Sequence, residues 1–235
     1  MNKTAILLAM FDMAGTTMDD VVEGYPLVIG AMMRAFAQHG IALEAKTISN
    51  QRGKEKREMV QALLEAVAGP TALVDPIYAA FLVELDRGLP GVREMGGARE
   101  VFAALKAQGI AIGAGSGFPT EVVERIVAQL RWAEEGLLDY YASSEQVGAG
   151  RPSPAMIHDA MAKLGVDDPR AVVKIGDTVM DVQEGKNAGV WTVAVLSGTQ
   201  SREQLAAAGP DAILTSIRDL PEWLETQGLV GRGAR

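Results

Sequence analysis

The chain has 235 residues, of which 48% are hydrophobic and 22% are charged, and it contains no cysteine. This composition is typical of a globular protein, and the lack of cysteine excludes disulfide bonds and thiolate metal sites. The formal net charge of −8 argues against nucleic acid or an anionic membrane as a partner, because such partners are bound through clustered lysine and arginine.

The first apolar run, residues 5–11, is too short for a membrane span or a signal peptide, and Asp12 ends it. We therefore expect a cytoplasmic protein with no membrane segment. Further along the chain, short apolar runs alternate with amphipathic segments. Strands are predicted over residues 5–12, 109–115, 139–143, 171–176, 190–196 and 211–214. Since helical patterns lie between most of these runs, the sequence predicts an α/β fold with a doubly wound parallel sheet.

Residues 19–90 depart from this alternation. They contain helical patterns near 24–39, 54–67 and 71–87 and no convincing strand, which predicts a helical cap inserted after the first strand. Turn-forming residues at 18–20 and 88–91 mark its two borders. The predicted organisation is a core of residues 1–18 and 91–235 and a cap of residues 19–90.

Polar side chains follow several of the predicted strands, at the sheet edge where α/β proteins bind ligands. They are Asp12 after the first strand, Ser116 and Gly117 after the second, Arg151 in the next loop, and Asp177 with Asp181 after the fourth. Taken one at a time, each also fits a turn, a helix cap or a solvated surface. Together they provide a carboxylate nucleophile, a hydroxyl group, a cation and two further acids, which is the set that Mg²⁺-dependent phosphoryl transfer requires.

These residues stand in the order of the four motifs of the haloacid dehalogenase superfamily of aspartate-nucleophile hydrolases, which the chain resembles. Longer stretches are similar to its phosphonoacetaldehyde hydrolase branch, namely residues 12–17, 150–154, 176–178 and 184–193. The resemblance implies a Rossmann-like core, with Ser116, Gly117 and Arg151 binding the phosphoryl group. It also implies Mg²⁺ held by Asp12, the backbone carbonyl of Ala14, Asp177 and Asp181.

Ala14 stands where the superfamily usually has a second aspartate, the general acid that protonates an alkoxide leaving group. An alanine removes that acid. Cleavage of a carbon–phosphorus bond poses a different problem, because the leaving group is a carbanion that needs an electron sink. An imine between a lysine and a substrate aldehyde provides such a sink.

The predicted cap helix over 54–67 offers two lysines for this imine. With about 100° of rotation per residue, Lys56 shares a face with Val60, Leu63 and Val67, whereas Lys54 shares the opposite face with Glu58 and Gln61. A solvated basic face is the alternative interpretation of these lysines. Against it, Lys56 interrupts the apolar stripe, and cations at the start of a helix oppose its macrodipole. The pattern therefore favours Lys56 as the inward-facing amine.

The resemblance implies the same choice, because residues 53–56 match the family pattern Gly-x-x-Lys with Lys56 as the imine-forming residue. We expect the neighbouring cations Arg52, Lys54 and Arg57 to lower the pKa of this amine and to favour the neutral nucleophile. The resemblance also implies a Met four residues before this lysine and a His three residues after it.

Arg52 and Met59 occupy those two positions in this chain. We expect Arg52 to contact an additional acidic group of the substrate, as in a different phosphonate or a related phosphorylated aldehyde. The chain's two histidines, His39 and His158, fall on predicted helices away from the motifs, where structural or exposed positions are expected.

The sequence thus predicts a Mg²⁺-dependent hydrolase that cleaves the carbon–phosphorus bond of phosphonoacetaldehyde or a related phosphonate. The predicted route uses an aspartyl phosphate on Asp12 and an imine on Lys56. A phosphatase of small phosphate monoesters and a non-catalytic phosphoryl-binding module stay open as alternatives. The partner in each case is a small molecule, and the resemblance implies a homodimer formed through the cap.

Overall fold

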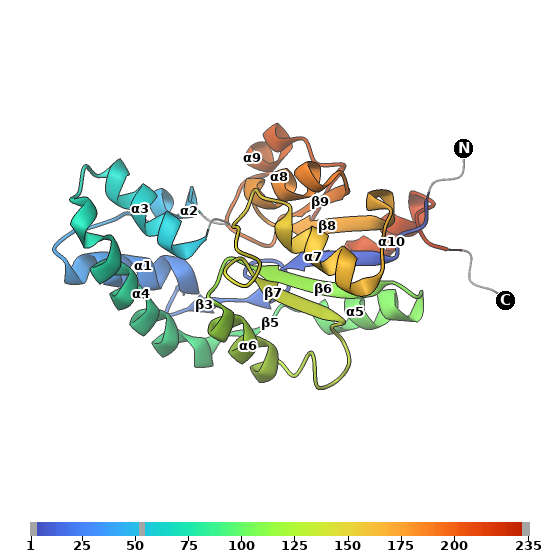
Figure 1. Ribbon diagram of the computed structural model, residues 1–235, viewed down its shortest axis with the longest axis horizontal. Coiled ribbons are helices and arrows are strands. Elements are labelled where there is room, and N and C mark those ends of the chain that lie inside the picture. The colour runs from blue at the N-terminus through green and yellow to red at the C-terminus, as the bar shows by residue number, and fades with distance from the viewer. Residues whose placement is uncertain (1–3, 52–54, 232–235) are drawn as a thin grey trace.

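A six-stranded parallel sheet forms the centre of the larger part of the molecule (Figure 1). The computed structural model describes residues 4–51 and 55–231. The strand order is β10-β9-β8-β1-β6-β7. The strands are β1 (Leu8–Asp12), β6 (Ala111–Ser116), β7 (Tyr140–Ser143), β8 (Val172–Gly176), β9 (Trp191–Val195) and β10 (Ala212–Leu214). Each predicted strand is present, so the predicted α/β fold with a doubly wound sheet is confirmed.

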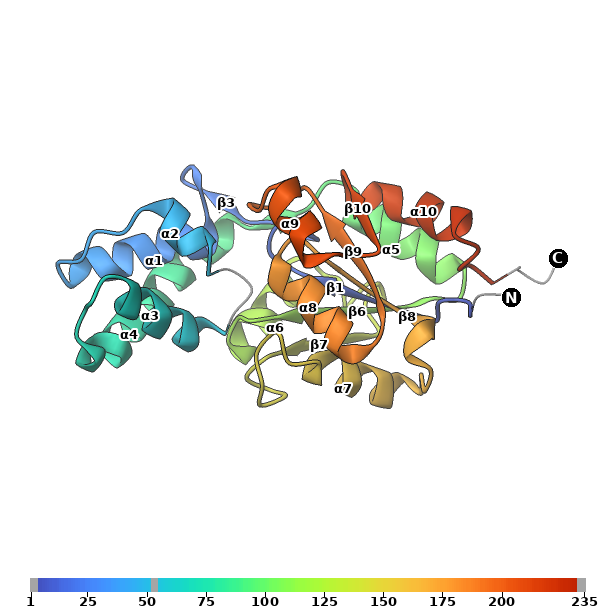
Figure 2. The ribbon, with the colours of Figure 1, turned by 90° about the horizontal axis from the view of Figure 1, so that it is seen from above.

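The central strand β1 is buried on both faces, because alternate side chains of a strand point to opposite sides of the sheet. Phe11 packs on one side against Phe102 of α5, with ring centroids 5.1 Å apart. Leu8 and Met10 pack on the other side in a cluster that includes Ile157 of α7. Figure 2 shows α5 and α10 on the opposite side of the strands from α7 and α8. The core helices are α5 (Ala98–Ala107), α6 (Thr120–Gln129), α7 (Ala155–Leu164), α8 (Val179–Ala188), α9 (Arg202–Ala208) and α10 (Leu220–Thr226).

A group of helices lies beside the core, at one end of the molecule (Figure 1). They are α1 (Leu27–Gln38), α2 (Ala45–Ser49), α3 (Lys56–Ala66) and α4 (Val74–Gly88). Helices α1 and α4 pack along each other, and Phe36 of α1 and Phe81 of α4 are both fully buried. A helical cap after the first strand is therefore present as predicted, and 19–90 remains our proposed range for it.

Short elements at the borders of the cap were not predicted. Strand β2 (Met18–Asp19) pairs antiparallel with β5 (Arg93–Glu94), so the two chain segments that enter and leave the cap are hydrogen-bonded side by side. A small hairpin of β3 (Val21–Val22) and β4 (Tyr25–Pro26) follows. Four 3₁₀ turns complete the described elements, at Thr71–Leu73, Leu89–Gly91, Pro169–Ala171 and Ile217–Asp219. None of the helices in the described ranges is long and apolar enough to cross a membrane.

Candidate active site

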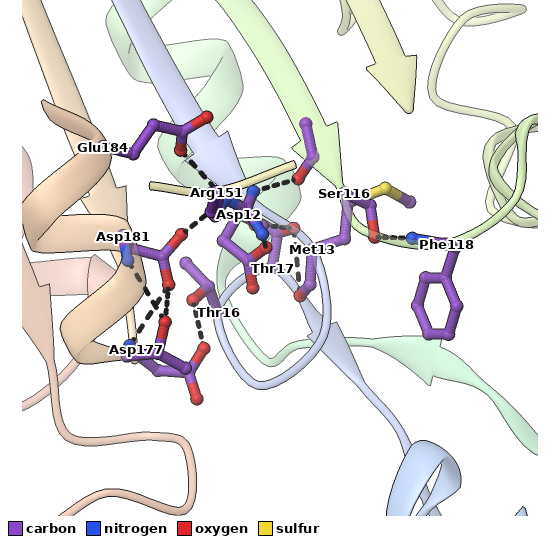
Figure 3. A network of polar contacts seen from close by, with 12 residues as sticks. Asp12, Met13, Thr16, Thr17, Ser116, Phe118, Arg151, Asp177, Asp181 and Glu184 are labelled. Atoms are coloured by element: carbon purple, nitrogen blue, oxygen red, sulfur yellow. Dashed lines mark hydrogen bonds and ion pairs between the residues drawn. The ribbon is translucent and has the colours of Figure 1, made fainter. Parts of the chain in front are cut away.

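The loop after β1 carries the first motif and is fixed by hydrogen bonds to its own backbone. The amide groups of Thr17 and Met18 donate to the carbonyl oxygen of Met13, and the hydroxyl of Thr17 donates to the Asp12 carbonyl oxygen at 2.9 Å. Gly15 has φ of +87°, a conformation that favours glycine. The loop therefore turns sharply and holds the Asp12 side chain at the carboxyl edge of the sheet (Figure 3).

Three buried carboxylates converge at this edge. Oxygen atoms of Asp12, Asp177 and Asp181 all lie within 4.8 Å of one another. Asp177 directly follows β8, and its Oδ1 accepts a hydrogen bond from the Thr16 hydroxyl at 3.1 Å. Asp181 lies in the first turn of α8, where its side chain and that of the N-cap residue Thr178 form a reciprocal capping box. A strand end, a loop and a helix start thus bring these acids together.

The acid cluster has the shape and donor type that suit a hard divalent cation. A Cβ atom at Gly198 would lie 1.8 Å from Oδ2 of Asp177, and one at Gly15 would lie 2.8 Å from the same oxygen. The two glycines therefore form a close backbone cradle around Asp177. Carboxylate and carbonyl oxygens are the ligands that Mg²⁺ prefers, so the residues present fit such an ion.

Arg151 lies at the centre of the same network and is almost completely buried. Its Nη1 lies 2.8 Å from Oδ1 of Asp12, and its Nη2 donates to the carbonyl oxygen of Gly115 at 2.8 Å. Its Nε donates to Oε2 of Glu184 at 2.9 Å (Figure 3). Burial alone would lower the pKa of Arg151, but the nearby carboxylates of Asp181, Asp12 and Glu184 raise it well above its usual value. The guanidinium is therefore a fixed positive charge.

Two further buried charges, Lys174 and Glu184, complete the network, and sequence reasoning gave neither a role. Lys174 Nζ lies 3.0 Å from Oδ1 of Asp181 and 3.0 Å from Oε2 of Glu184. Burial alone would raise the pKa of Asp181, but Arg151, Lys174 and the Thr178 hydroxyl hold it below its usual value. A lysine within the otherwise apolar segment 172–176 was the available signal.

Ser116 ends β6 and Gly117 follows it, and Ser116 lies on the side of Asp12 away from Asp181 and Glu184 (Figure 3). The Ser116 hydroxyl oxygen accepts a hydrogen bond from the backbone amide of Phe118 at 3.2 Å. Both residues line a small pocket that also includes Asp12 of the carboxylate cluster. The lining residues are Asp12, Ala14, Val28, Lys56, Ser116, Gly117, Phe118, Arg151 and Thr178.

Lys56 reaches this pocket from the cap. It is the first residue of α3 and only 5% exposed, and its Nζ lies 5.2 Å from the centroid of the Phe118 ring. Val60 and Leu63, which were expected on the same face, are buried with it. Val67 was also expected there, but it is 40% exposed because α3 ends at Ala66 and the helical geometry stops. Cap and core therefore meet at Lys56.

Of the other cations predicted near Lys56, Arg57 is the one that the structure describes. Arg57 points to the surface and forms an ion pair with Asp75 at 2.6 Å, so its charge is shared with a carboxylate. Arg52, predicted to bind substrate, and Lys54 lie outside the described residues. His39 follows the end of α1 and His158 lies within α7, and neither lines the pocket.

Comparison with known proteins agrees with this geometry. Residues 6–189 match the haloacid dehalogenase-like hydrolase family. The chain belongs to this family of hydrolases.

Within the family, the chain is 30% identical to a phosphonoacetaldehyde hydrolase of Bacillus cytotoxicus, over 92% of this chain and 94% of the relative. The fold is similar to the crystal structure of a phosphonoacetaldehyde hydrolase-like protein from Oleispira antarctica, with a TM-score of 0.82, 24% identity and coverage of 100% and 96% of the two chains. It is also similar to a structure from Lactobacillus delbrueckii described as a phosphoglycolate phosphatase, with a TM-score of 0.81, 22% identity and coverage of 97% and 100%.

Proposed function

We propose that this hydrolase cleaves the carbon–phosphorus bond of phosphonoacetaldehyde or a closely related small phosphonate aldehyde. The observation that carries the proposal is the meeting of Asp12 and Lys56 in one pocket, together with Ala14 at the position of the usual general acid. A carboxylate nucleophile and a buried amine are the two groups that this reaction needs. A phosphatase would have no use for the amine and would need the general acid that this chain lacks at position 14.

Lys56 acts first in the proposed reaction. Its neutral amine adds to the substrate aldehyde, and loss of water gives an imine. The low exposure of Lys56 favours this step, because burial keeps water from the imine. The Phe118 ring beside Nζ adds apolar surface on the same side. The imine then lies across the pocket from the Asp12 carboxylate.

Asp12 attacks phosphorus in the second step. The phosphorus–oxygen bond to Asp12 forms while the carbon–phosphorus bond breaks. The bonding electron pair moves into the imine, which is protonated on its nitrogen at this stage, and a neutral enamine results. Water then hydrolyses the aspartyl phosphate to inorganic phosphate. The enamine takes up a proton on carbon, and hydrolysis of the resulting imine releases acetaldehyde and returns the free amine of Lys56.

Ser116, Gly117 and Arg151 are proposed to bind the phosphoryl oxygens, since all three line the pocket next to Asp12. Arg52 is proposed as a further substrate contact. Mg²⁺ would be held by Asp12, the Ala14 carbonyl, Asp177 and Asp181, and it would neutralise charge on the phosphoryl group. Asp181 is already in contact with Arg151 and Lys174 at 3.2 and 3.0 Å, which supports an outer role for it in holding the ion.

Charge balance supports the same ligand class. The network holds four carboxylates, Asp12, Asp177, Asp181 and Glu184, against the cations Arg151 and Lys174. A divalent cation would cancel the excess of negative charge, and the protonated imine on Lys56 would make the pocket positive. Such a pocket attracts a phosphonate dianion in spite of the net charge of −8 of the whole chain.

Turnover of phosphonoacetaldehyde and of a simple phosphomonoester, measured in parallel with Mg²⁺, tests the proposal. We expect the phosphonate to be the better substrate, and borohydride added during turnover to attach the carbon fragment to Lys56. K56R should abolish both trapping and phosphonate turnover, whereas K46R, at an exposed cap lysine, should change neither. Equal or faster phosphomonoester turnover without trapping would identify a phosphatase, and Mg²⁺-dependent phosphate binding without any turnover would identify a binding module.

A further inference from the structure

Four buried charges, one of them the pocket residue Arg151, form a closed ring of alternating sign. Arg151 Nε lies 3.2 Å from Oδ1 of Asp181 and 2.9 Å from Oε2 of Glu184. Lys174 Nζ lies 3.0 Å from each of the same two oxygens. All four side chains are at most 2% exposed. Each cation of the ring therefore contacts both carboxylates, and each carboxylate contacts both cations.

The packing of α8 on the sheet makes this ring geometrically feasible. Gly185, next to Glu184, has no room for a side chain, because a Cβ there would lie 2.6 Å from Cγ2 of Thr192 and 3.0 Å from Cβ of Lys174. The helix can approach β8 and β9 this closely only with a glycine at that point. The approach brings Glu184 over Lys174 in the middle of the sheet.

The three nitrogen atoms of the Arg151 guanidinium contact different groups. Glu184 and Asp181 contact Nε, the carbonyl oxygen of Gly115 accepts from Nη2 at 2.8 Å, and Nη1 contacts Asp12. A planar guanidinium held at two of its nitrogen atoms has no rotational freedom left for the third. The direction of Nη1 toward Asp12 is thus set by Asp181, Glu184 and the Gly115 carbonyl, which do not line the pocket.

We propose that Glu184, neutralised by Lys174, is a positioning residue that aims the Arg151 guanidinium at the phosphoryl-binding side of Asp12. Glu184 does not line the pocket and acts through Arg151. Lys174 is needed because the carboxylates of Glu184 and Asp181 face the same atoms and would otherwise repel each other. This assignment rests on the proposed function only in that Arg151 binds a phosphoryl group, and it holds for phosphonate and phosphate ester alike.

Inorganic phosphate binding to the Mg²⁺-loaded protein, measured by calorimetry, tests the assignment without turnover. Glu184→Gln keeps the shape of the side chain and removes its charge, and we expect it to weaken phosphate binding about tenfold, the cost of one hydrogen bond between charged groups. The matched control is Glu84→Gln, another buried glutamate paired with arginine, 2.8 Å from Arg34 Nε in the cap. The control should bind phosphate like the unchanged protein.

A double-mutant cycle separates positioning from general electrostatics. In an Arg151→Lys background the Nε contact does not exist, so adding Glu184→Gln should have no further effect on phosphate binding. Equal losses in both backgrounds would mean that Glu184 does not act through the Arg151 guanidinium and would overturn the assignment. Unchanged phosphate affinity in folded Glu184→Gln would overturn it as well.

A measurement on the unchanged protein covers the case in which Glu184→Gln does not fold. The Nε–H proton of Arg151, buried and bonded to Glu184, should give a resolved NMR signal that exchanges slowly with water. Fast exchange of this proton would overturn the assignment. If the proposed carbon–phosphorus cleavage does not occur, borohydride will not trap a carbon fragment on Lys56. The phosphate-binding results would still test the role of Glu184 in that case.

Discussion

Nη1 of Arg151 lies 2.8 Å from Oδ1 of Asp12, which joins a loop after β7 to the end of the central strand. A cation in this place stabilises the ionised carboxylate and lies beside the position of attack on phosphorus. Asp12 lies within the cluster of three carboxylates, contacts Arg151 and also lines the pocket.

Replacement of the Asp12 carboxylate by an amide should therefore remove catalysis. We expect D12N to lower kcat at least about a thousandfold with either substrate, because an amide cannot form the acyl phosphate. D86N, at the exposed end of a cap helix where Asp86 pairs with Arg125, is the control and should keep full activity. Phosphate release measured under saturating Mg²⁺ checks both, and residual turnover of D12N above a few per cent would contradict the nucleophile assignment.

Ala14 lines the pocket two residues after Asp12, so its replacement tests why the general acid is absent. We expect A14D to raise kcat/KM for a phosphomonoester at least about tenfold, because a positioned acid can protonate the alkoxide leaving group. The same variant should gain nothing with phosphonoacetaldehyde, whose leaving group is an enamine.

A14N provides nearly the same volume without an ionisable proton and is the matched control. It should not raise phosphomonoester turnover. For each variant, the kcat/KM for the phosphomonoester is divided by the kcat/KM for phosphonoacetaldehyde. If A14D leaves this ratio unchanged, the result contradicts the proposal that Lys56 takes the place of a general acid missing at position 14.

The fold, and the placement of Asp12 and Asp177 at one edge of the sheet, could be predicted from the sequence because their signals are local. The apolar runs mark the strands, and the polar residues after them mark the sheet edge, as with Asp12 and Asp177. Lys174 was missed because a single lysine in a short apolar run says nothing about which helix covers it. Its partner Glu184 lies on the next helix, and their contact depends on the close approach that Gly185 permits.

Other misses have equally physical causes. Helix α2 has five residues, too few for an amphipathic period to show. Strands β2 and β5 have two residues each, and their pairing joins Met18 to Glu94 across the whole cap. The ion pair of Arg57 with Asp75 turns a cation away from Lys56 and could not be read from helix periodicity alone. The homodimer and the cytoplasmic location stay predictions.

The acid stability of the metal-free protein should depend on Asp181. Burial would raise the pKa of this carboxyl, but Arg151, Lys174 and Thr178 lower it below the ordinary value of 3.8. Because the folded-state pKa lies below the unfolded one, the ionised carboxylate stabilises the fold above pH 3.8, and this contribution is lost as the pH falls from there through the folded-state pKa.

Urea unfolding in EDTA at a series of pH values between neutrality and the acid limit measures this effect. D181N should be less stable at neutral pH, because it leaves Arg151 and Lys174 with fewer counter-charges, and it should lose less stability than the unchanged protein on acidification. Parallel pH curves for the two proteins would show that Asp181 titrates alike in the folded and unfolded states, against this prediction.

Gly198 lies so close to Asp177 that a side chain there must displace the carboxylate. A Cβ would lie 1.8 Å from Oδ2 of Asp177, well inside van der Waals contact, and 2.5 Å from its Cβ. We therefore expect G198A to raise the Mg²⁺ concentration for half-maximal activity at least about tenfold, because loss of well-oriented ligation weakens metal binding by this order. Saturating Mg²⁺ should recover part of the activity, since Asp12 and the pocket are not altered directly.

Gly96 supplies the control for this substitution, because a Cβ there would first meet Arg218 Nη2 at an ordinary distance of 3.7 Å. G96A should show the same Mg²⁺ dependence as the unchanged protein. Titration of metal-free protein with Mg²⁺, followed by both turnover and calorimetry, separates weaker metal binding from a general loss of folded protein. A G198A protein that keeps its Mg²⁺ affinity would mean that Asp177 can move without consequence, and the acid cluster would then lose its assignment as the metal site.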